Sequence, residues 1–171
     1  MYNRIAIIGG SGSGKTTLAN KLSEIYNIPP THIDGINHLE NWQERDKEER
    51  DKMILEIASQ EKWIIDGTYR ATLRPRLERA DLIIWLDFST IALLKGVIGR
   101  YLKNKGKEKP EIPGCKEKLD KEFLFRVFKF NKTKRNIIVE NLEGIDKNKV
   151  VILKNRKQVN NWFEKLKNEK Q

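Results

Sequence analysis

The chain has 171 residues, a length typical of one domain with a full hydrophobic core, and its single cysteine, Cys115, excludes an internal disulfide. No stretch reaches the roughly 20 apolar residues of a membrane-spanning helix and the N-terminus lacks a signal-peptide pattern, so we expect a cytoplasmic protein with no membrane partner. The net charge is +10, but the window from Lys95 to Arg135 holds fourteen Lys or Arg against five Asp or Glu, which favours an anionic ligand held by one segment.

A phosphate-binding loop is predicted near the N-terminus. An apolar strand at residues 4–8 leads directly into the sequence GGSGSGKT at 9–16, and a helix with an apolar stripe follows at 15–26. The loop matches the pattern G-x-x-x-x-G-K-[ST], in which small residues let backbone N–H groups approach phosphate oxygens. Its fixed positions are Gly9, Gly14, Lys15 and Thr16.

Two side chains of this loop have predicted roles in nucleotide binding. Lys15 is expected to reach the β- and γ-phosphates, and the hydroxyl of Thr16 is expected to bind Mg²⁺. The positive end of the following helix faces the same anion. The loop therefore predicts nucleotide binding, without specifying a reaction.

A second candidate site follows a short strand predicted at residues 31–33. Asp34 comes at the end of that strand, where it could accept a hydrogen bond from a substrate hydroxyl, act as a base or bind a metal through water. A purely structural role for Asp34 stays open. His32 and His38 are six residues apart with no cysteine nearby, a poor zinc pair, so structural roles are favoured for them.

The next elements are predicted from capping and apolar patterns. Asn41 and Glu44 have the spacing of a capping box, which predicts a helix over residues 41–59. A third strand is predicted at 63–65, and a basic turn or short helix at 73–79.

The third strand ends in a candidate metal site. Asp66 follows it directly, and Mg²⁺ needs an oxygen anion at the carboxyl end of a buried strand, where open α/β sheets bind their ligands. Arg70, four residues on, could clamp a phosphate with two hydrogen bonds. The alternative is that Asp66 only forms a turn with Gly67, since Asp-Gly is a common turn pair.

A rival acidic residue follows the fourth predicted strand, the apolar run at residues 82–86. Asp87 could bind the metal instead, or cap the next helix together with Ser89, which is expected to cap a helix over 90–102. Asp66 is preferred because an arginine at productive spacing accompanies it, and phosphoryl transfer needs both signs of charge.

The remaining chain predicts a flap and the last elements of an α/β domain. Residues 104–115 carry glycines, prolines and many charges without periodicity, which predicts a mobile flap. Helices at 119–130 and 134–142, a strand at 150–153 and a final helix carrying Val159, Trp162 and Leu166 follow. Alternating strands and helices predict a parallel sheet covered on both faces. The basic residues that could close over a triphosphate are Arg100, Arg126, Lys134 and Arg135.

The order of these motifs resembles the adenylate-kinase-like P-loop kinases. A narrower resemblance, to proteins called DNA topology modulation proteins (FlaR-like), rests on Asp34, the W-I-I-D-G-x-Y pattern at residues 63–69, the R-L-E-R-A-D-x-I-I-x-L-D pattern at 76–87 and the flap with its following helix. The resemblance implies a single three-layer P-loop kinase domain over residues 1–171, with a five-stranded parallel sheet in the order 2-3-1-4-5. It also implies a substrate-side helical insert at about 35–60 and a mobile basic lid at about 103–120.

The resemblance further implies ATP and Mg²⁺ as cofactors. The residues implied for ATP are Gly9, Gly10, Ser11, Gly12, Ser13, Gly14, Lys15, Thr16, Thr17, Arg100 and Arg156. The residues expected to act in transfer are Lys15, Asp34, Asp66, Arg70, Arg100 and Arg126, with Thr16 and Asp66 at the metal. The chain departs from adenylate kinases in the segment after its third strand and at the AMP site, so AMP is not implied as acceptor. The lid lacks a four-cysteine set, so no structural metal is expected.

Two functions of different classes are therefore carried forward. The first is an ATP-dependent phosphotransferase that moves the γ-phosphoryl group of MgATP to a small hydroxyl- or phosphate-bearing acceptor. The second is a nucleotide-regulated protein whose basic window binds DNA, although the sequence has no zinc-finger, helix-turn-helix or RNA-binding strand pattern. The acceptor and the oligomeric state stay open.

Overall fold

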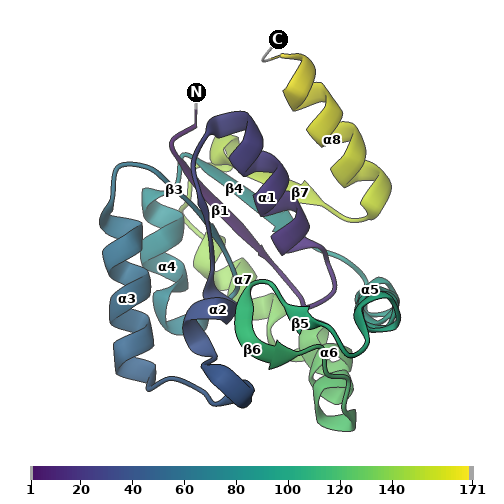
Figure 1. Cartoon of the computed structure of the whole chain (residues 1–171). Coiled ribbons are helices and arrows are strands. Elements are labelled where there is room, and N and C mark those ends of the chain that lie inside the picture. The colour runs from purple at the N-terminus through teal and green to yellow at the C-terminus, as the bar shows by residue number, and fades with distance from the viewer. Residues whose placement is uncertain (1, 170–171) are drawn as a thin grey trace.

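The structure, a computed structural model, describes residues 2–169 and is built on a five-stranded parallel sheet (Figure 1). The strand order is β2-β3-β1-β4-β7, which confirms the predicted order 2-3-1-4-5, because β7 is the fifth strand of this sheet along the chain. The strands are β1 (Arg4–Gly9), β2 (Pro30–His32), β3 (Trp63–Asp66), β4 (Leu82–Leu86) and β7 (Val150–Leu153).

Helices cover both faces of the sheet, as Figure 1 shows. They are α1 (Lys15–Tyr26), α2 (Ile33–Asn37), α3 (Lys47–Ser59), α4 (Arg70–Arg79), α5 (Thr90–Asn104), α6 (Lys121–Thr133), α7 (Arg135–Leu142) and α8 (Arg156–Asn168), with short 3₁₀ turns η1 (Glu40–Trp42) and η2 (Lys147–Lys149). No helix within residues 2–169 is both long and apolar enough to cross a membrane.

The apolar strand residues alternate between two cores. Ile5 and Ile7 of β1 pack with α1, α5 and α8, whereas Ala6 and Ile8 pack with α3, α4 and α7. This period of two is what a strand buried on both faces requires, and it explains why β1 and β4 are continuous apolar runs. The sheet is therefore a rigid support whose carboxyl edge carries the loops of the candidate site.

The predicted start of the second long helix was wrong. α3 begins at Lys47, and its N-cap is Asp46, whose carboxylate accepts hydrogen bonds from the backbone of Glu48 and Glu49. Asn41 instead lies in η1 with a φ of 56°, a left-handed conformation that a helix start does not use. The capping-box spacing occurred in a segment that tertiary contacts hold in another conformation.

The flap was also mispredicted as a segment without regular structure. It forms a small antiparallel hairpin of β5 (Glu108–Lys109) and β6 (Ile112–Lys116). Two other boundaries differ: β2 ends at His32, so Asp34 lies in the first turn of α2, and α4 is a full helix rather than a turn. The predicted cap Ser89, at the start of α5, is confirmed, since its side chain accepts from the N–H of Ala92.

Candidate active site

The loop between β1 and α1 has the backbone of an anion cradle. Gly12 and Gly14 have φ values of 83° and 94°, a left-handed conformation that glycine adopts without strain. α1 begins at Lys15 without a side-chain cap, so the N–H groups of its first turn are left for an anion. The predicted phosphate loop therefore lies at the carboxyl end of the central strand, in the conformation its glycines favour.

Helix α5 packs directly against this loop, which the sequence did not predict. Gly96 lies against the carbonyl oxygen of Gly12, so closely that a Cβ at position 96 would collide with it. Gly12 in turn lies against Leu93 and Val97 of the same helix. A backbone contact of this closeness fixes the loop through a distant helix, and glycine at 96 is the residue that permits it.

The side chain of Lys15 lies over the loop, where its Nζ donates to the carbonyl of Gly10 at 3.0 Å. Burial lowers the pKa of Lys15, and the negative charges of Asp66 and Asp34 oppose that shift. Both carboxylates are therefore close enough for their charge to act on the lysine. The predicted phosphate-binding cation, Lys15, and the two predicted acidic residues, Asp34 and Asp66, therefore lie at one edge of the sheet.

The strand register brings His32 to the buried Asp66. His32 pairs with Asp66 across β2 and β3, and its Nδ1 donates to Oδ2 of Asp66 at 2.7 Å. Burial alone would lower the pKa of His32, but this hydrogen bond and the carboxylate charge raise it. The sequence indicated a structural role for His32 and missed this contact, because the two residues are 34 positions apart.

The donor set at Asp66 fits a magnesium ion. The bond from His32 uses Oδ2, which leaves Oδ1 of Asp66 for Mg²⁺ or for one of its waters. Mg²⁺ usually takes one or two carboxylates together with phosphate oxygens and waters, so it needs no dense protein cage. Within residues 2–169 no cluster of three or more His, Cys, Asp or Glu could hold a metal.

Thr68 joins the loop after β3 to the phosphate loop. Its hydroxyl accepts from the N–H of Gly9 at 2.9 Å and donates to the carbonyl of Gly9 at 3.0 Å. The loop that carries Asp66 is therefore tied to the start of the phosphate loop by both backbone groups of one residue.

A buried arginine, Arg76 of α4, also holds the loop that follows β3. Its side chain is fully buried and donates to the carbonyls of Thr72 at 3.1 Å, Gly67 at 3.0 Å and Tyr69 at 3.4 Å. Burial lowers its pKa to about 10, which still leaves it charged at neutral pH. Sequence reasoning missed this residue, because an arginine in a basic helix normally points to solvent.

Asp34 is held by Tyr69, from the loop that follows β3. The hydroxyl of Tyr69 donates to Oδ1 of Asp34 at 3.0 Å, and the guanidinium of Arg50 lies over the Tyr69 ring at 5.1 Å. Arg50 also donates to the buried Asn37 at 3.0 Å. Asp34 is exposed, so its second oxygen can accept a hydrogen bond from a bound molecule.

The end of α5 and the flap each place a cation near Lys15. Arg100, near the end of α5, pairs with the buried Glu117 at 3.0 Å, and the positive charges of Arg100 and Lys109 act on Lys15. The prediction that Arg100 lies near the phosphates stays a prediction, and the structure adds Lys109 as a neighbour of the site.

The flap is docked on the segment between α2 and α3. Cys115 is buried; its sulfur accepts from the N–H of Trp42 at 3.1 Å and donates to the carbonyl of Leu39 at 3.2 Å. The indole Nε1 of Trp42 donates to the carbonyl of Lys116 at 3.1 Å, and Lys109 Nζ lies over its ring at 5.3 Å. The side chains of Trp42 and Cys115 therefore join the two segments.

Loss of the Trp42 side chain is expected to loosen the flap. In Trp42→Ala, reaction of Cys115 with a thiol reagent should accelerate at least ~10-fold, because opening of the flap exposes the sulfur. Trp42→Phe keeps the ring and loses only the indole donor, so its rate should lie between those of the wild type and the alanine variant. Equal rates in all three proteins would show that Trp42 does not hold the flap.

Four of the predicted cations and acids are exposed or already paired. Arg70 is exposed at the first position of α4, and Arg126 is exposed with its guanidinium 5.9 Å from the Phe123 ring. Asp87 is held by Arg135 through two hydrogen bonds of 2.9 and 3.0 Å, so it does not cap α5. This ion pair disfavours Asp87 as a metal ligand and accounts for Arg135.

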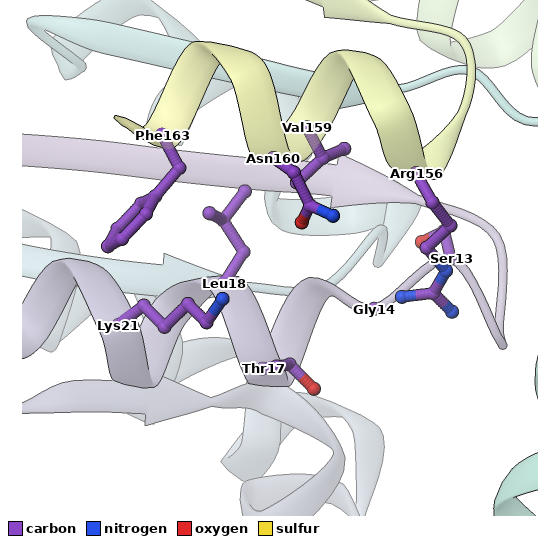
Figure 2. Close-up of a pocket in the computed structure, with 9 residues that line it drawn as sticks. All are labelled: Ser13, Gly14, Thr17, Leu18, Lys21, Arg156, Val159, Asn160 and Phe163. Atoms are coloured by element: carbon purple, nitrogen blue, oxygen red, sulfur yellow. The ribbon is translucent and has the colours of Figure 1, made fainter. Parts of the chain in front are cut away.

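A shallow cleft lies beside the phosphate loop, between α1 and α8 (Figure 2). Arg156, at the start of α8, donates to the carbonyl of Gly12 at 3.0 Å and lies next to Gly14. Figure 2 shows Thr17 and Asn160 on opposite walls of this cleft. Its lining residues are Ser13, Gly14, Thr17, Leu18, Lys21, Arg156, Val159, Asn160 and Phe163.

Known structures share this arrangement of strands and helices, although no protein-family model and no curated protein matches the chain. Shikimate kinase from Acinetobacter baumannii, solved in complex with shikimate, has a TM-score of 0.60 at 18% identity over 96% of this chain and 90% of that one. Shikimate kinase from Bacteroides thetaiotaomicron has 0.59 at 18% over 99% and 98%, and gluconokinase from Sinorhizobium meliloti 1021 has 0.52 at 17% over 98% and 97%.

The chain therefore has the P-loop kinase fold, and its similarity to these small-molecule kinases extends over nearly its whole length. The narrower resemblance to DNA topology modulation proteins finds no support in these comparisons.

Proposed function

We propose that the protein is an ATP-dependent kinase that transfers the γ-phosphoryl group to a hydroxyl of a small acceptor. The observation that carries the proposal is that the phosphate loop with Lys15, Asp66 and Asp34 come at the carboxyl ends of three neighbouring parallel strands, β1, β3 and β2, and so lie at one edge of the sheet. A phosphoryl-transfer site needs cations on the phosphates, an oxygen anion for the metal and a group that orients the acceptor, and these residues supply all three.

In the proposed reaction the acceptor oxygen bonds to the γ-phosphorus, the bond to the β–γ bridging oxygen breaks, and ADP leaves. Mg²⁺, when bound, neutralises charge on the β- and γ-oxygens. Thr16 and Asp66 would hold it, and Lys15 and the amides of the phosphate loop would bind the triphosphate. Asp34, fixed by Tyr69, would accept the proton of the acceptor hydroxyl.

The walls of the acceptor pocket are assigned by the same proposal. The segment at about 35–60 would form the acceptor side, and residues at about 103–120 would form the lid, as expected from the sequence. The docking of the hairpin on Trp42 supports this assignment, since it closes one segment on the other. A closed lid excludes water, which competes with the acceptor. Arg156 and its cleft would bind the nucleoside end of ATP.

The proposal is tested with the purified protein, MgATP and a panel of sugar acids, polyols, nucleosides and nucleotides. ADP release that depends on one acceptor, with a matching phosphorylated product by mass spectrometry, is the expected result. Titration calorimetry of MgATP provides the prior test. If no heat is observed up to millimolar nucleotide and no acceptor stimulates turnover, the proposed function is wrong.

A second candidate function is nucleotide-regulated DNA binding, which the narrower family resemblance implies. Lys103, Lys105 and Lys107 support it, because all three are exposed where α5 leads into the flap. Direct DNA binding through these lysines requires a steep dependence of affinity on salt, and loss of that affinity when the three are neutralised.

A further inference from the structure

Helices α5 and α6 form an antiparallel pair at the edge of the molecule. Asn131, near the end of α6, donates to Thr90 at the start of α5 at 3.2 Å. At the opposite end, Arg100 near the end of α5 pairs with Glu117, four residues before α6. Figure 1 shows the pair beside the sheet, with the flap between them in the chain.

Both helices bury one side on the same core. Leu93 and Val97 of α5 and Val127 of α6 are buried members of that core. The side of each helix opposite this core is exposed to solvent. The two exposed sides belong to adjacent helices and are together called the α5–α6 face.

The α5–α6 face is apolar to an unusual degree for a surface. Its large apolar side chains and their exposed fractions are Ile91 (67%), Ile98 (41%), Leu102 (70%), Phe125 (55%) and Phe128 (51%). On α5 they follow a helical spacing, so they form a stripe rather than scattered positions. Exposed apolar side chains gathered on one surface mark an interaction site.

The same face is strongly basic. Its exposed basic side chains are Lys95, which lies within the apolar stripe of α5, and Lys121, Lys129 and Lys132 of α6, against one acidic residue, Glu122. Lys129 extends over the ring of Phe125, with Nζ at 4.2 Å from its centre. Lysines in this arrangement can keep their charge in a polar layer while their stems and the neighbouring rings enter an apolar one.

We propose that the α5–α6 face docks the protein on an anionic lipid surface. A layer of negative headgroups over hydrocarbon matches both properties of the face, the basic side chains and the apolar ones. A second copy of the chain is disfavoured, because two such faces would bring like charges together. Nucleic acid could bind the lysines and stack on the phenylalanine rings. It has no apolar layer, however, in which Ile91, Ile98 and Leu102 could be buried.

Docking through this face leaves the candidate active site accessible. Gly96 and Val97 face the phosphate loop, whereas Ile98 and Leu102 point away from it. The expectation of no membrane partner rested on the absence of a spanning segment, and a surface contact needs none.

The test is co-sedimentation of the full chain with vesicles of phosphatidylcholine alone or with about one third phosphatidylserine. The proposal expects binding only to the anionic vesicles, weakened at least ~10-fold in Phe125→Ser/Phe128→Ser and about 100-fold in Lys121→Gln/Lys129→Gln/Lys132→Gln. The matched control Leu55→Ser/Ile152→Ser, exposed apolar residues elsewhere, should bind as the wild type does.

Three outcomes would overturn the proposal: no binding to anionic vesicles, equal binding by the phenylalanine variant, or binding of duplex or single-stranded DNA that the same phenylalanine substitutions abolish. The first shows no lipid contact, the second shows a purely electrostatic contact, and the third assigns the face to nucleic acid. None depends on phosphoryl transfer, so failure here is distinguishable from failure of the proposed kinase activity.

Discussion

Replacing Lys15 with Ala is expected to lower ATP-dependent phosphoryl transfer by about 10³-fold or more while leaving the protein folded. The amine lies over the phosphate loop, where it donates to the carbonyl of Gly10, and the charges of Asp66 and Asp34 act on it. Without it, negative charge that develops on the transferred group meets two carboxylates with less compensation. The measurement is kcat for the acceptor found in the panel, together with the thermal midpoint.

A matched control separates this loss from a general effect of removing a positive charge. Lys62 is exposed at the amino end of β3, the end of the sheet opposite the phosphate loop, so Lys62→Ala should keep full turnover. Stability should hardly change in Lys15→Ala, because the amine makes one hydrogen bond, to the carbonyl of Gly10. A folded Lys15→Ala variant with unchanged turnover would remove the proposed mechanism.

The parts of the fold that the sequence predicted are those that depend on local patterns. The phosphate loop is a short motif with a strand before it and a helix after it, and both neighbours show clear periodicity. β1 and β4 are continuous apolar runs because both faces of the sheet are covered. Both could therefore be predicted from the sequence as buried strands. Sheet order came from the resemblance, since strand pairing is not encoded locally.

The parts that failed depend on contacts between distant residues. The hairpin of the flap is polar and short, and it is held by Cys115 on the segment that contains Trp42, 73 positions away. The contact of Gly96 with Gly12 likewise joins two elements whose packing no local pattern specifies. His32 was interpreted as structural because its partner Asp66 comes into reach only through the strand register.

Replacing Arg76 with Met is expected to destabilise the fold by about 3 kcal/mol, a shift of the thermal midpoint by roughly 6–12 °C. Two effects oppose each other. Burial lowers the pKa of Arg76 to about 10, so removing the charge relieves a penalty of roughly 3 kcal/mol. Methionine, however, leaves the carbonyls of Gly67, Thr72 and Tyr69 without this donor, at about 1–3 kcal/mol each, together with the bonds themselves. The second effect is the larger one.

The same substitution should also impair the site, because Arg76 holds the loop that places Asp66 and Thr68. Arg79→Met is the matched control: Arg79 lies in the same helix and also donates to two carbonyls, but it is exposed, so its loss should cost less than about 1 kcal/mol. Arg76→Lys keeps the charge with fewer donors and should fall between the two in stability. Equal denaturant midpoints and equal MgATP affinities in Arg76→Met and Arg79→Met would contradict this prediction. The buried guanidinium would then only fill space, and the loop after β3 would be positioned against the phosphate loop by Thr68 alone.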